Sequence, residues 1–265
     1  MFTLYSRIAM YSKPEWSESH LPTLHAFIRS HPLGILTTAI PSPSYPLIQS
    51  THLPWLLDTN QPNLDNQEKG KLRGHIARQN PQAKAIIDSL PADSSSTLPT
   101  EIMILFTSPV QHYVTPKFYT ATKPATGKVA PTWNYAAVQV YGRVKVFHDS
   151  SDPETEAFLS TQLQDLAAFT EREMMGYTGE DGKEEAWRVD EAPEGYLRIL
   201  KKNIVGLEVE IDRIEGKFKM SQERAIKDRE GVIKGFEQMG TETATQMADM
   251  VKSRGELNDQ KKSTR

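Results

Sequence analysis

Short apolar segments separated by polar, proline-rich connections dominate the chain, and most of them are too short to be helices. Where apolar and polar residues alternate with a period of two, the pattern predicts half-buried strands. The clearest case follows Trp133, where Val138, Val140 and Val144 alternate with polar or aromatic residues. Strands are predicted over 33–40, 47–57, 71–77, 101–107, 113–119, 137–147 and 204–214.

Helices are predicted where apolar residues recur every three or four positions, or where the sequence carries a helix start. Asn80-Pro81 and Asp152-Pro153 each place a capping side chain before a proline, which is typical of a first helical turn. Residues 255–265 are charged and nearly free of apolar side chains, so this end is predicted to be disordered. Further helices are predicted over 19–30, 193–202 and about 247–251, the last within a charged tail that begins at Met220.

The order of these elements favours an antiparallel sheet. Strands and helices do not alternate regularly, as they do in parallel α/β sheets, so the predicted fold class is mainly β with peripheral helices (α+β), a small antiparallel barrel. The predicted division is an N-terminal extension (1–9), a barrel domain with helical insertions over about 152–202 (10–215), a C-terminal helical tail (216–254) and the disordered end (255–265).

Composition and charge exclude several kinds of site. The chain of 265 residues has 31 basic and 34 acidic side chains, a net charge of −3 and no cysteine. Disulfides, thiolate metal sites and cysteine nucleophiles are therefore excluded. Nucleic acid is not favoured as a partner, because Lys and Arg are not concentrated along the sequence. No apolar run approaches the roughly 20 residues that span a bilayer, so no membrane association is expected and a cytoplasmic location is predicted.

No catalytic template is present, so the candidate chemistry rests on three stretches of polar and aromatic residues. The sequence lacks a nucleophile elbow, a P-loop, a dinucleotide glycine motif and a metal-binding His-Glu-x-x-His helix. Gln49–Pro54 places four hydrogen-bonding side chains on a predicted strand. Gly74–Pro81 joins a strand to a helix start, whose free N–H groups suit a phosphate. Pro131–Tyr135 combines Trp133 with an amide, which suits a heteroaromatic ring.

Each stretch also has an ordinary structural interpretation. Strand-to-helix turns of this kind are common in proteins. Trp133 and Tyr135 suit a hydrophobic core, and Asn134 is a frequent turn former. Each stretch considered alone is consistent with both a ligand-binding role and a purely structural role.

Taken together, the stretches resemble the PaiB-type family of FMN-binding split-barrel proteins, over about 10–250. The resemblance implies a six-stranded antiparallel split barrel, related to pyridoxamine-phosphate oxidase and flavin reductase barrels. It also implies a homodimer with FMN at the subunit interface. The motifs that carry it are Thr51-His52-Leu53-Pro54, Gly74-His75-Ile76-Ala77 with Asn80-Pro81, Tyr113-Val114-Thr115-Pro116-Lys117-Phe118-Tyr119, Pro131-Thr132-Trp133-Asn134-Tyr135 and Lys219-Met220-Ser221-Gln222.

The same resemblance implies a set of cofactor-binding residues. The strand Gln49–Leu53 would line the flavin and its ribityl chain, and the second stretch would approach the ribityl-phosphate end. The tryptophan motif would come from the facing subunit or the rim, and Ser221-Gln222 would close the pocket. The residues so expected are Gln49, Ser50, Thr51, His52, Leu53, His75, Ile76, Ala77, Asn80, Thr132, Trp133, Asn134, Ser221 and Gln222. No catalytic residue and no metal ligand is expected.

Four functions are consistent with such a barrel. The first is an FMN-binding flavoprotein, as an FMN-dependent oxidoreductase with a nicotinamide donor. The second follows the family's naming as negative transcriptional regulators, although the sequence has no helix-turn-helix pattern or basic stripe. The third is haem binding or degradation, with His52, His75 and His112 as candidate ligands. The fourth is a dimer with only a structural or interaction role.

Overall fold

The structure is a computed structural model that describes residues 10–59, 69–92 and 96–263. The predicted N-terminal extension over 1–9 lies outside the described residues. The chain forms two compact units, and the strands β8 (Thr132–Phe147) and β9 (Ile204–Lys219) run through both. The first unit consists of Met1–Leu24, Thr107–Gln139 and Glu215–Arg265, and the second of His25–Phe106 and Val140–Ile214.

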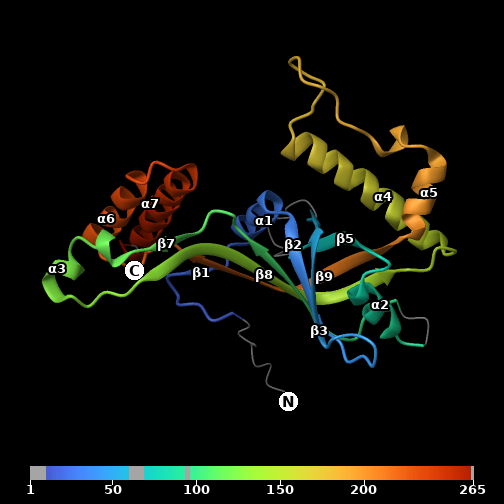
Figure 1. Ribbon diagram of the computed structural model, residues 1–265, viewed down its shortest axis with the longest axis horizontal. Coiled ribbons are helices and arrows are strands. Elements are labelled where there is room, and N and C mark those ends of the chain that lie inside the picture. Colours follow the sequence, from blue (N-terminus) through green and yellow to red (C-terminus); the bar gives the residue numbers. More distant parts are fainter. Residues whose placement is uncertain (1–9, 60–68, 93–95, 264–265) are drawn as a thin grey trace. The chain divides into compact units, whose positions relative to one another are not determined.

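The sheet has the strand order β3-β2-β6-β8-β9-β5-β4 (Figure 1). The pairs β2–β3, β2–β6, β4–β5 and β5–β9 are antiparallel. Within the second unit β3 and β5, which stand near opposite ends of this order, lie close together, so the sheet curls. This arrangement of six long strands confirms the predicted antiparallel split barrel. The bounds not yet given are β2 Leu33–Ala39, β3 Ile48–Pro54, β4 Leu56–Asp58, β5 Lys71–Ala77 and β6 Ile102–Thr107.

The interior of the second unit is filled by apolar side chains from alternate strand positions. Leu36, Leu72 and Ile76 are each at most 1% exposed. Trp55, also 1% exposed, occupies space that two glycines leave free. A Cβ atom added to either Gly34 or Gly74 would lie 2.9 Å from the indole ring. These glycines therefore serve close packing, and the barrel interior has no room for a second large ring.

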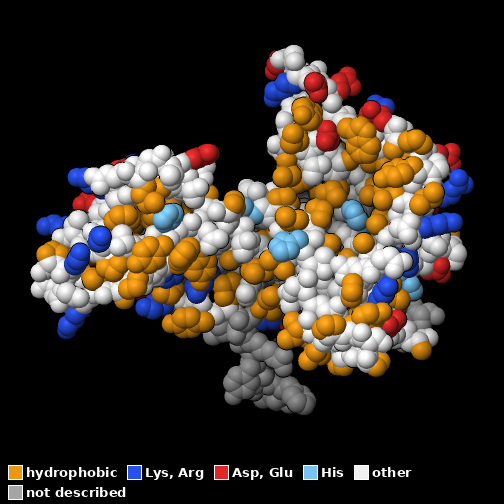
Figure 2. All heavy atoms as spheres, in the orientation of Figure 1, with side chains coloured by type: hydrophobic (Ala, Val, Ile, Leu, Met, Phe, Trp, Pro, Cys, Tyr) orange, Lys and Arg blue, Asp and Glu red, His pale blue; other side chains and the backbone are white. Residues whose placement is uncertain are grey.

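Helices cover the outside of the second unit. They are α2 (Pro81–Asp88), α4 (Pro153–Phe169), which continues as a π-helical turn (Thr170–Met174), and α5 (Glu194–Lys202). Helix α4 packs on the sheet through Phe158, which stacks on Phe147 at 3.9 Å and would clash with a side chain at Gly206. Figure 2 shows apolar side chains at the surface over α4 and α5, and Tyr196 and Ile199 are 59% and 61% exposed.

In the first unit two short strands extend the pairing of the long ones. Strand β1 (Ser17–Glu18) pairs with the end of β9, and β7 (His112–Val114) pairs with the start of β8. Helices α6 (Ile226–Glu237) and α7 (Glu242–Ser263) lie side by side (Figure 1), and α3 (Thr122–Thr126) is a single short helix. Helix α1 (Leu21–Ser30) belongs to both units. None of the helices in the described part of the chain has the length and apolarity that a membrane crossing needs.

The predicted disorder of 255–265 is wrong for the part that the structure describes, because α7 continues through Ser263. Tertiary contacts stabilise this polar helix end. The Arg229 guanidinium pairs with Asp259, and Asn258 donates to the carbonyl of Gln222 at 2.8 Å. Gly255 allows the close approach of Arg229, since a Cβ there would lie 2.4 Å from the Arg229 Nε atom.

The strand entrance at Trp133 also differs from the prediction. Trp133 and Asn134 lie within β8 rather than in a turn before it, because β7 pairs with them: His112 is opposite Asn134 and Tyr113 opposite Trp133. Strand β9 likewise runs to Lys219, five residues beyond its predicted end, because its last part pairs with β1.

Candidate functional site

Polar side chains connect strand β3 to the start of helix α2 in the second unit. The Asn80 side chain caps the helix, since its Oδ1 atom accepts from the N–H of Gln82 at 2.8 Å. Its Nδ2 atom donates to Thr51 Oγ1 at 3.1 Å. Gln82, only 1% exposed, donates through Nε2 to the carbonyls of Leu36 and Gln49. Polar groups of β3 that the sequence suggested for a ligand therefore hold α2 on the barrel.

The expected residues on β3 divide between two faces of the strand. Opposite residues of an antiparallel pair share a face, and Gln49 and Thr51 are paired with the buried Thr38 and Leu36. Leu53, 6% exposed, belongs to this inner face. Ser50 and His52 lie on the outer face and are exposed, and Ser50 Oγ is 2.9 Å from Thr37 Oγ1. A ligand on one side of β3 can therefore contact only one of the two sets.

Strand β5 divides in the same way. Ile76 is 1% exposed and belongs to the barrel core. His75 and Ala77 lie on the opposite face, together with Arg73, which contacts Asp165 of α4. His75 is paired with Gly206, and its ring is largely buried. Burial lowers the pKa of His75, so its imidazole is neutral at neutral pH.

Three buried polar atoms in this region have no hydrogen-bond partner among the described residues: Gln49 Nε2, Gln82 Oε1 and His75 Nδ1. A buried donor or acceptor left unpaired costs about 1–3 kcal/mol. Such atoms are candidates for contact with a ligand or with water. Gln49 and His75 are among the residues that the sequence resemblance assigns to the cofactor.

Two cations, Arg78 and Lys84, are near the start of α2 in the sequence, and Arg78 is engaged. Arg78, the nearest arginine in the sequence, donates to three backbone carbonyls: those of Lys202 at 2.9 Å, His148 at 2.6 Å and Ile204 at 3.3 Å. Asn80 already occupies one N–H group of the helix start, and Pro81 has none. The expected phosphate-binding end therefore offers neutral hydrogen-bonding groups and Lys84, but no free arginine.

The remaining expected residues belong to the first unit. Asn134 is fully buried and accepts through Oδ1 from Ser221 Oγ at 3.1 Å, while its Nδ2 atom has no partner in the described part of the chain. Ser221 adopts a left-handed backbone conformation, with φ at +60°. The amide of Gln222 accepts from the N–H of Met220 at 2.6 Å and donates to the carbonyls of Glu15 and Phe218. Gln222 thus holds the turn after β9.

Thr132 and Trp133, at the start of β8, contact Lys219 of β9. The Lys219 ammonium donates to Thr132 Oγ1 and, at 2.7 Å, to the carbonyl of Trp133. The Trp133 ring is 49% exposed and lies 6.1 Å from the ring of Tyr113. Lys219 is not among the residues expected to bind a cofactor. Its sequence signal is the Lys217-Phe218-Lys219 alternation, which places both lysines on one face of a strand.

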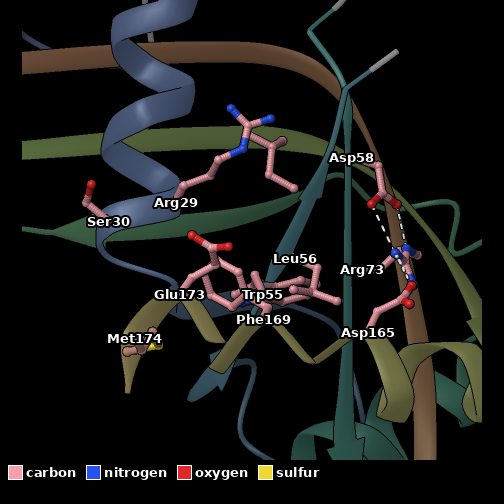
Figure 3. A pocket seen from close by; sticks show the side chains of 11 residues that line it. Arg29, Ser30, Trp55, Leu56, Asp58, Arg73, Asp165, Phe169, Glu173 and Met174 are labelled. Atoms are coloured by element: carbon pink, nitrogen blue, oxygen red, sulfur yellow. Dashed lines mark hydrogen bonds and ion pairs between the residues drawn. The ribbon is translucent and has the colours of Figure 1, made fainter. Parts of the chain in front are cut away.

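The second unit also contains a pocket of about 700 Å³ beside α4 (Figure 3). Figure 3 shows the Arg73 guanidinium between two carboxylates, at 2.5 Å from Asp58 and 2.8 Å from Asp165. None of the expected cofactor residues lines this pocket. No local sequence pattern predicts it, because its lining residues come from segments that are distant in the sequence. The lining residues are Arg29, Ser30, Trp55, Leu56, Leu57, Asp58, Arg73, Asp165, Phe169, Glu173 and Met174.

Comparison with known families identifies the barrel. Residues 10–213 match the family described as "Putative FMN-binding domain". The chain belongs to this family. The cofactor of this family is FMN, in agreement with the expectation from the sequence motifs. The match covers all of β8 and most of β9, and it ends before α6 and α7.

Relatives exist in fungi and bacteria. An uncharacterized protein of Aspergillus fumigatus is 54% identical over 263 residues, which cover 95% of this chain and all of the relative. A second, from Emericella nidulans, is 49% identical over 257 residues, with 95% of this chain and all of the relative covered. The protease synthase and sporulation protein PAI 2 of Bacillus subtilis is 22% identical over 183 residues, which are 69% of this chain and 72% of that protein.

Proposed function

We propose that this chain binds FMN and is an FMN-dependent oxidoreductase that takes electrons from a nicotinamide donor. The observation that carries the proposal is the family match over residues 10–213, which contains all of the sheet except the last part of β9. A bound flavin would supply the redox chemistry, and the protein would supply its position and its electrostatic environment.

The second unit has groups that fit a flavin. His75 lies on the outer face of β5 and offers a neutral, buried ring nitrogen without a partner among the described residues. The carbonyl and imine atoms along a flavin ring edge would accept from an N–H donor of this ring. Since the barrel interior is filled by Trp55 and its neighbours, the ring would lie against the outer face of the sheet. Ser50 and His52 are exposed on that face.

We also propose that the chain acts as a homodimer. Leu33, Leu47 and Ile48 lie on β2, β3 and the connection between them, and they are 58%, 54% and 67% exposed. Leu33 pairs with Pro54 and Ile48 with Ala39, so Leu33 and Ile48 lie on the same face of the β2–β3 hairpin, at its opposite ends. Exposed apolar side chains along one face of a sheet favour a protein partner. A second copy that covered this face of the hairpin would remove both from water. It would also bring Ser50 and His52 to a subunit interface, as the family resemblance implies.

The test is whether the purified chain carries FMN and reduces it. Expected are a yellow protein, FMN in a mass spectrum of the released ligand, and loss of flavin absorbance when NADH or NADPH is added without oxygen. A colourless protein that also fails to bind added FMN would contradict the proposal. Flavin that no nicotinamide donor reduces would contradict the oxidoreductase alone.

The homodimer has a separate test. Light scattering should give twice the chain mass for the natural sequence, and Ile48→Glu should shift it toward the monomer. Lys252→Glu, at an exposed position of α7, is the matched control. A natural chain that is monomeric at micromolar concentration would contradict the proposed dimer.

Haem is a second candidate ligand, and one observation favours it. Metal ligation needs a neutral imidazole, and burial lowers the pKa of His75 so that the ring is neutral at neutral pH. The ring nitrogen Nδ1 is also unpartnered among the described residues. Titration with haemin should then give a shifted Soret band that His75→Ala removes. An unshifted spectrum would exclude this candidate.

A further inference from the structure

The pocket beside α4 is large enough for a small-molecule ligand. Its volume of about 700 Å³ falls within the range of about 300–1,000 Å³ that is usual for ligand sites. All of its lining residues belong to the second unit, so one compact unit forms the whole pocket. None of them is among the residues expected to bind the cofactor. The pocket is therefore a candidate site for a ligand other than the flavin.

An ionic cluster lies at one end of the pocket (Figure 3). Arg73 of β5 donates to Asp58 of β4 and to Asp165 of α4, and it also donates to the Gln162 side chain at 3.4 Å. The Arg73 side chain is only 14% exposed, and these contacts fix it between the sheet and the helix. Two carboxylates against one guanidinium leave a net negative charge at this end. An anionic group of a ligand would therefore not be stabilised here.

Apolar side chains form the middle of the pocket, between the ionic cluster and the end of α1 (Figure 3). Trp55 precedes β4 and Leu56 begins it, and they are 1% and 8% exposed. Phe169 is the last residue of α4, and Leu57 and Met174 are further apolar lining residues. An aromatic and aliphatic surface of this kind favours an apolar body of matching size.

Helix α4 and its π-helical turn line the pocket with residues that are four positions apart. Asp165, Phe169 and Glu173 recur at this interval and so lie on one side of the helix. In the π-helical turn the Met175 N–H donates to the carbonyl of Thr170, five positions earlier, at 3.0 Å. Such turns occur frequently at functional sites. Here the turn carries Glu173, a charged residue at the end of the pocket opposite the ionic cluster.

Two charges of opposite sign lie at this second end, Glu173 and Arg29 near the end of α1. In the part of the chain that the structure describes, neither forms an ion pair, with the other or with a third residue. Arg29 donates to Thr59 Oγ1 at 2.8 Å, which uses one of the five N–H groups of its guanidinium and does not compensate its charge. Both side chains are exposed, so a ligand can reach them from solvent.

We propose that this pocket binds an α-amino acid with a large apolar side chain. The ammonium and the carboxylate of such a ligand lie together at one end of the molecule, as Glu173 and Arg29 do in the pocket. Arg29 would donate to the carboxylate and Glu173 would accept from the ammonium, both in charge-assisted hydrogen bonds. The side chain would lie against the apolar middle of the pocket, and the negative charge of the Arg73 cluster would disfavour an acidic side chain. The inference goes beyond the proposed function and does not depend on a bound flavin.

The experiment titrates the whole chain with ligands that each lack one feature, and calorimetry measures the binding. L-Phenylalanine has both charges and an apolar side chain. Phenylethylamine lacks the carboxylate, phenylpropionate lacks the ammonium, and L-glutamate has an acidic side chain in place of the apolar one. The variants are Arg29→Gln and Glu173→Gln. Arg172→Gln and Glu180→Gln are the matched controls, since both positions are exposed in the same unit and do not line this pocket. Circular dichroism verifies that each variant is folded.

The expected result is that L-phenylalanine binds the natural chain and that each of the other three ligands binds at least about tenfold more weakly. Arg29→Gln and Glu173→Gln should each weaken the binding of L-phenylalanine about 10- to 100-fold, and each control should change it less than about twofold. Arg29→Gln should not weaken phenylethylamine, which has no carboxylate. Glu173→Gln should not weaken phenylpropionate, which has no ammonium.

Three results would overturn the proposal. The first is no binding of L-phenylalanine at concentrations up to about 10 mM. The second is binding that Arg29→Gln and Glu173→Gln leave within about twofold of the natural chain. The third is an affinity for phenylethylamine or phenylpropionate that equals the affinity for L-phenylalanine. A chain that binds FMN but not L-phenylalanine would refute this inference alone, and one that binds L-phenylalanine but not FMN would refute only the proposed function.

Discussion

His75 should give the chain a pH-dependent stability that one substitution removes. Burial lowers the pKa of this imidazole below its usual 6.5 in the folded chain. The unfolded chain exposes the ring, so its pKa returns to about 6.5. Below that pH the unfolded state binds more protons than the folded state does. The stabilisation is therefore complete above pH 6.5 and is lost as the pH falls toward the folded-state pKa.

The magnitude follows from this difference in proton binding. Proton uptake by the unfolded ring between pH 7.5 and pH 5.5 sets an upper limit of about 1.4 kcal/mol on the fall in the free energy of unfolding that His75 causes. Glutamine at this position keeps a polar side chain but does not titrate. The loss over the interval should then be smaller in His75→Gln than in the natural chain, by at most about 1.4 kcal/mol. Burial lowers the pKa of His25 as well, but that residue is present in both chains and cancels.

The assay is urea unfolding at pH 7.5, 6.5 and 5.5, followed by tryptophan fluorescence. His52→Gln is the control, because it makes the same exchange at a histidine that is exposed on β3. The comparison uses the change with pH and not the absolute stability, so a general loss from the substitution does not affect it. Equal losses in the natural chain and in His75→Gln would refute a buried, neutral imidazole.

Three further substitutions test the packing within each unit. In Gly142→Ala the new Cβ would lie 2.0 Å from the carbonyl oxygen of Glu210, so we expect a loss of at least about 3 kcal/mol in thermal or urea unfolding. Gly195→Ala, where the nearest atom is 3.8 Å away, should be neutral or slightly stabilising. Burial alone would raise the pKa of Asp228, but hydrogen bonds from Thr122 and adjacent N–H groups lower it overall. Asp228→Asn should therefore cost about 1–3 kcal/mol at pH 7 and less as the pH falls below about 4, and a constant cost would contradict this.

Elements with local signals could be predicted from the sequence. The strand over 71–77 was predicted at the bounds that β5 has, because its alternation lies within one segment. Helix α2 begins at Pro81, as the Asn80-Pro81 pair indicated, since a capping side chain and a proline act within a single turn. The sequence also indicated a break in the strand at Pro54. In the structure β3 ends there and β4 follows as a separate short strand.

Features that depend on distant partners could not be predicted in the same way. The last part of β9 pairs with β1, which lies nearly 200 positions earlier in the chain. Helix α7 is poor in apolar residues at its end, and the Arg229–Asp259 ion pair that stabilises it joins two helices. Lys217 and Lys219 belong to a mixed-charge segment in the sequence, and only the fold brings both to Trp16.

The alternation of strand faces changes what the expected cofactor residues can mean. The sequence motif presents Gln49 through Leu53 as one continuous lining, but successive residues of β3 point to opposite sides. Thr51 contacts the helix cap, and Leu53 packs in the filled interior. A ring as large as a flavin therefore has access to the outer set, Ser50 and His52. The inner set would act on such a ligand only through the position of the strand. A motif shared across a family can thus combine residues that hold the barrel together with residues that meet the cofactor.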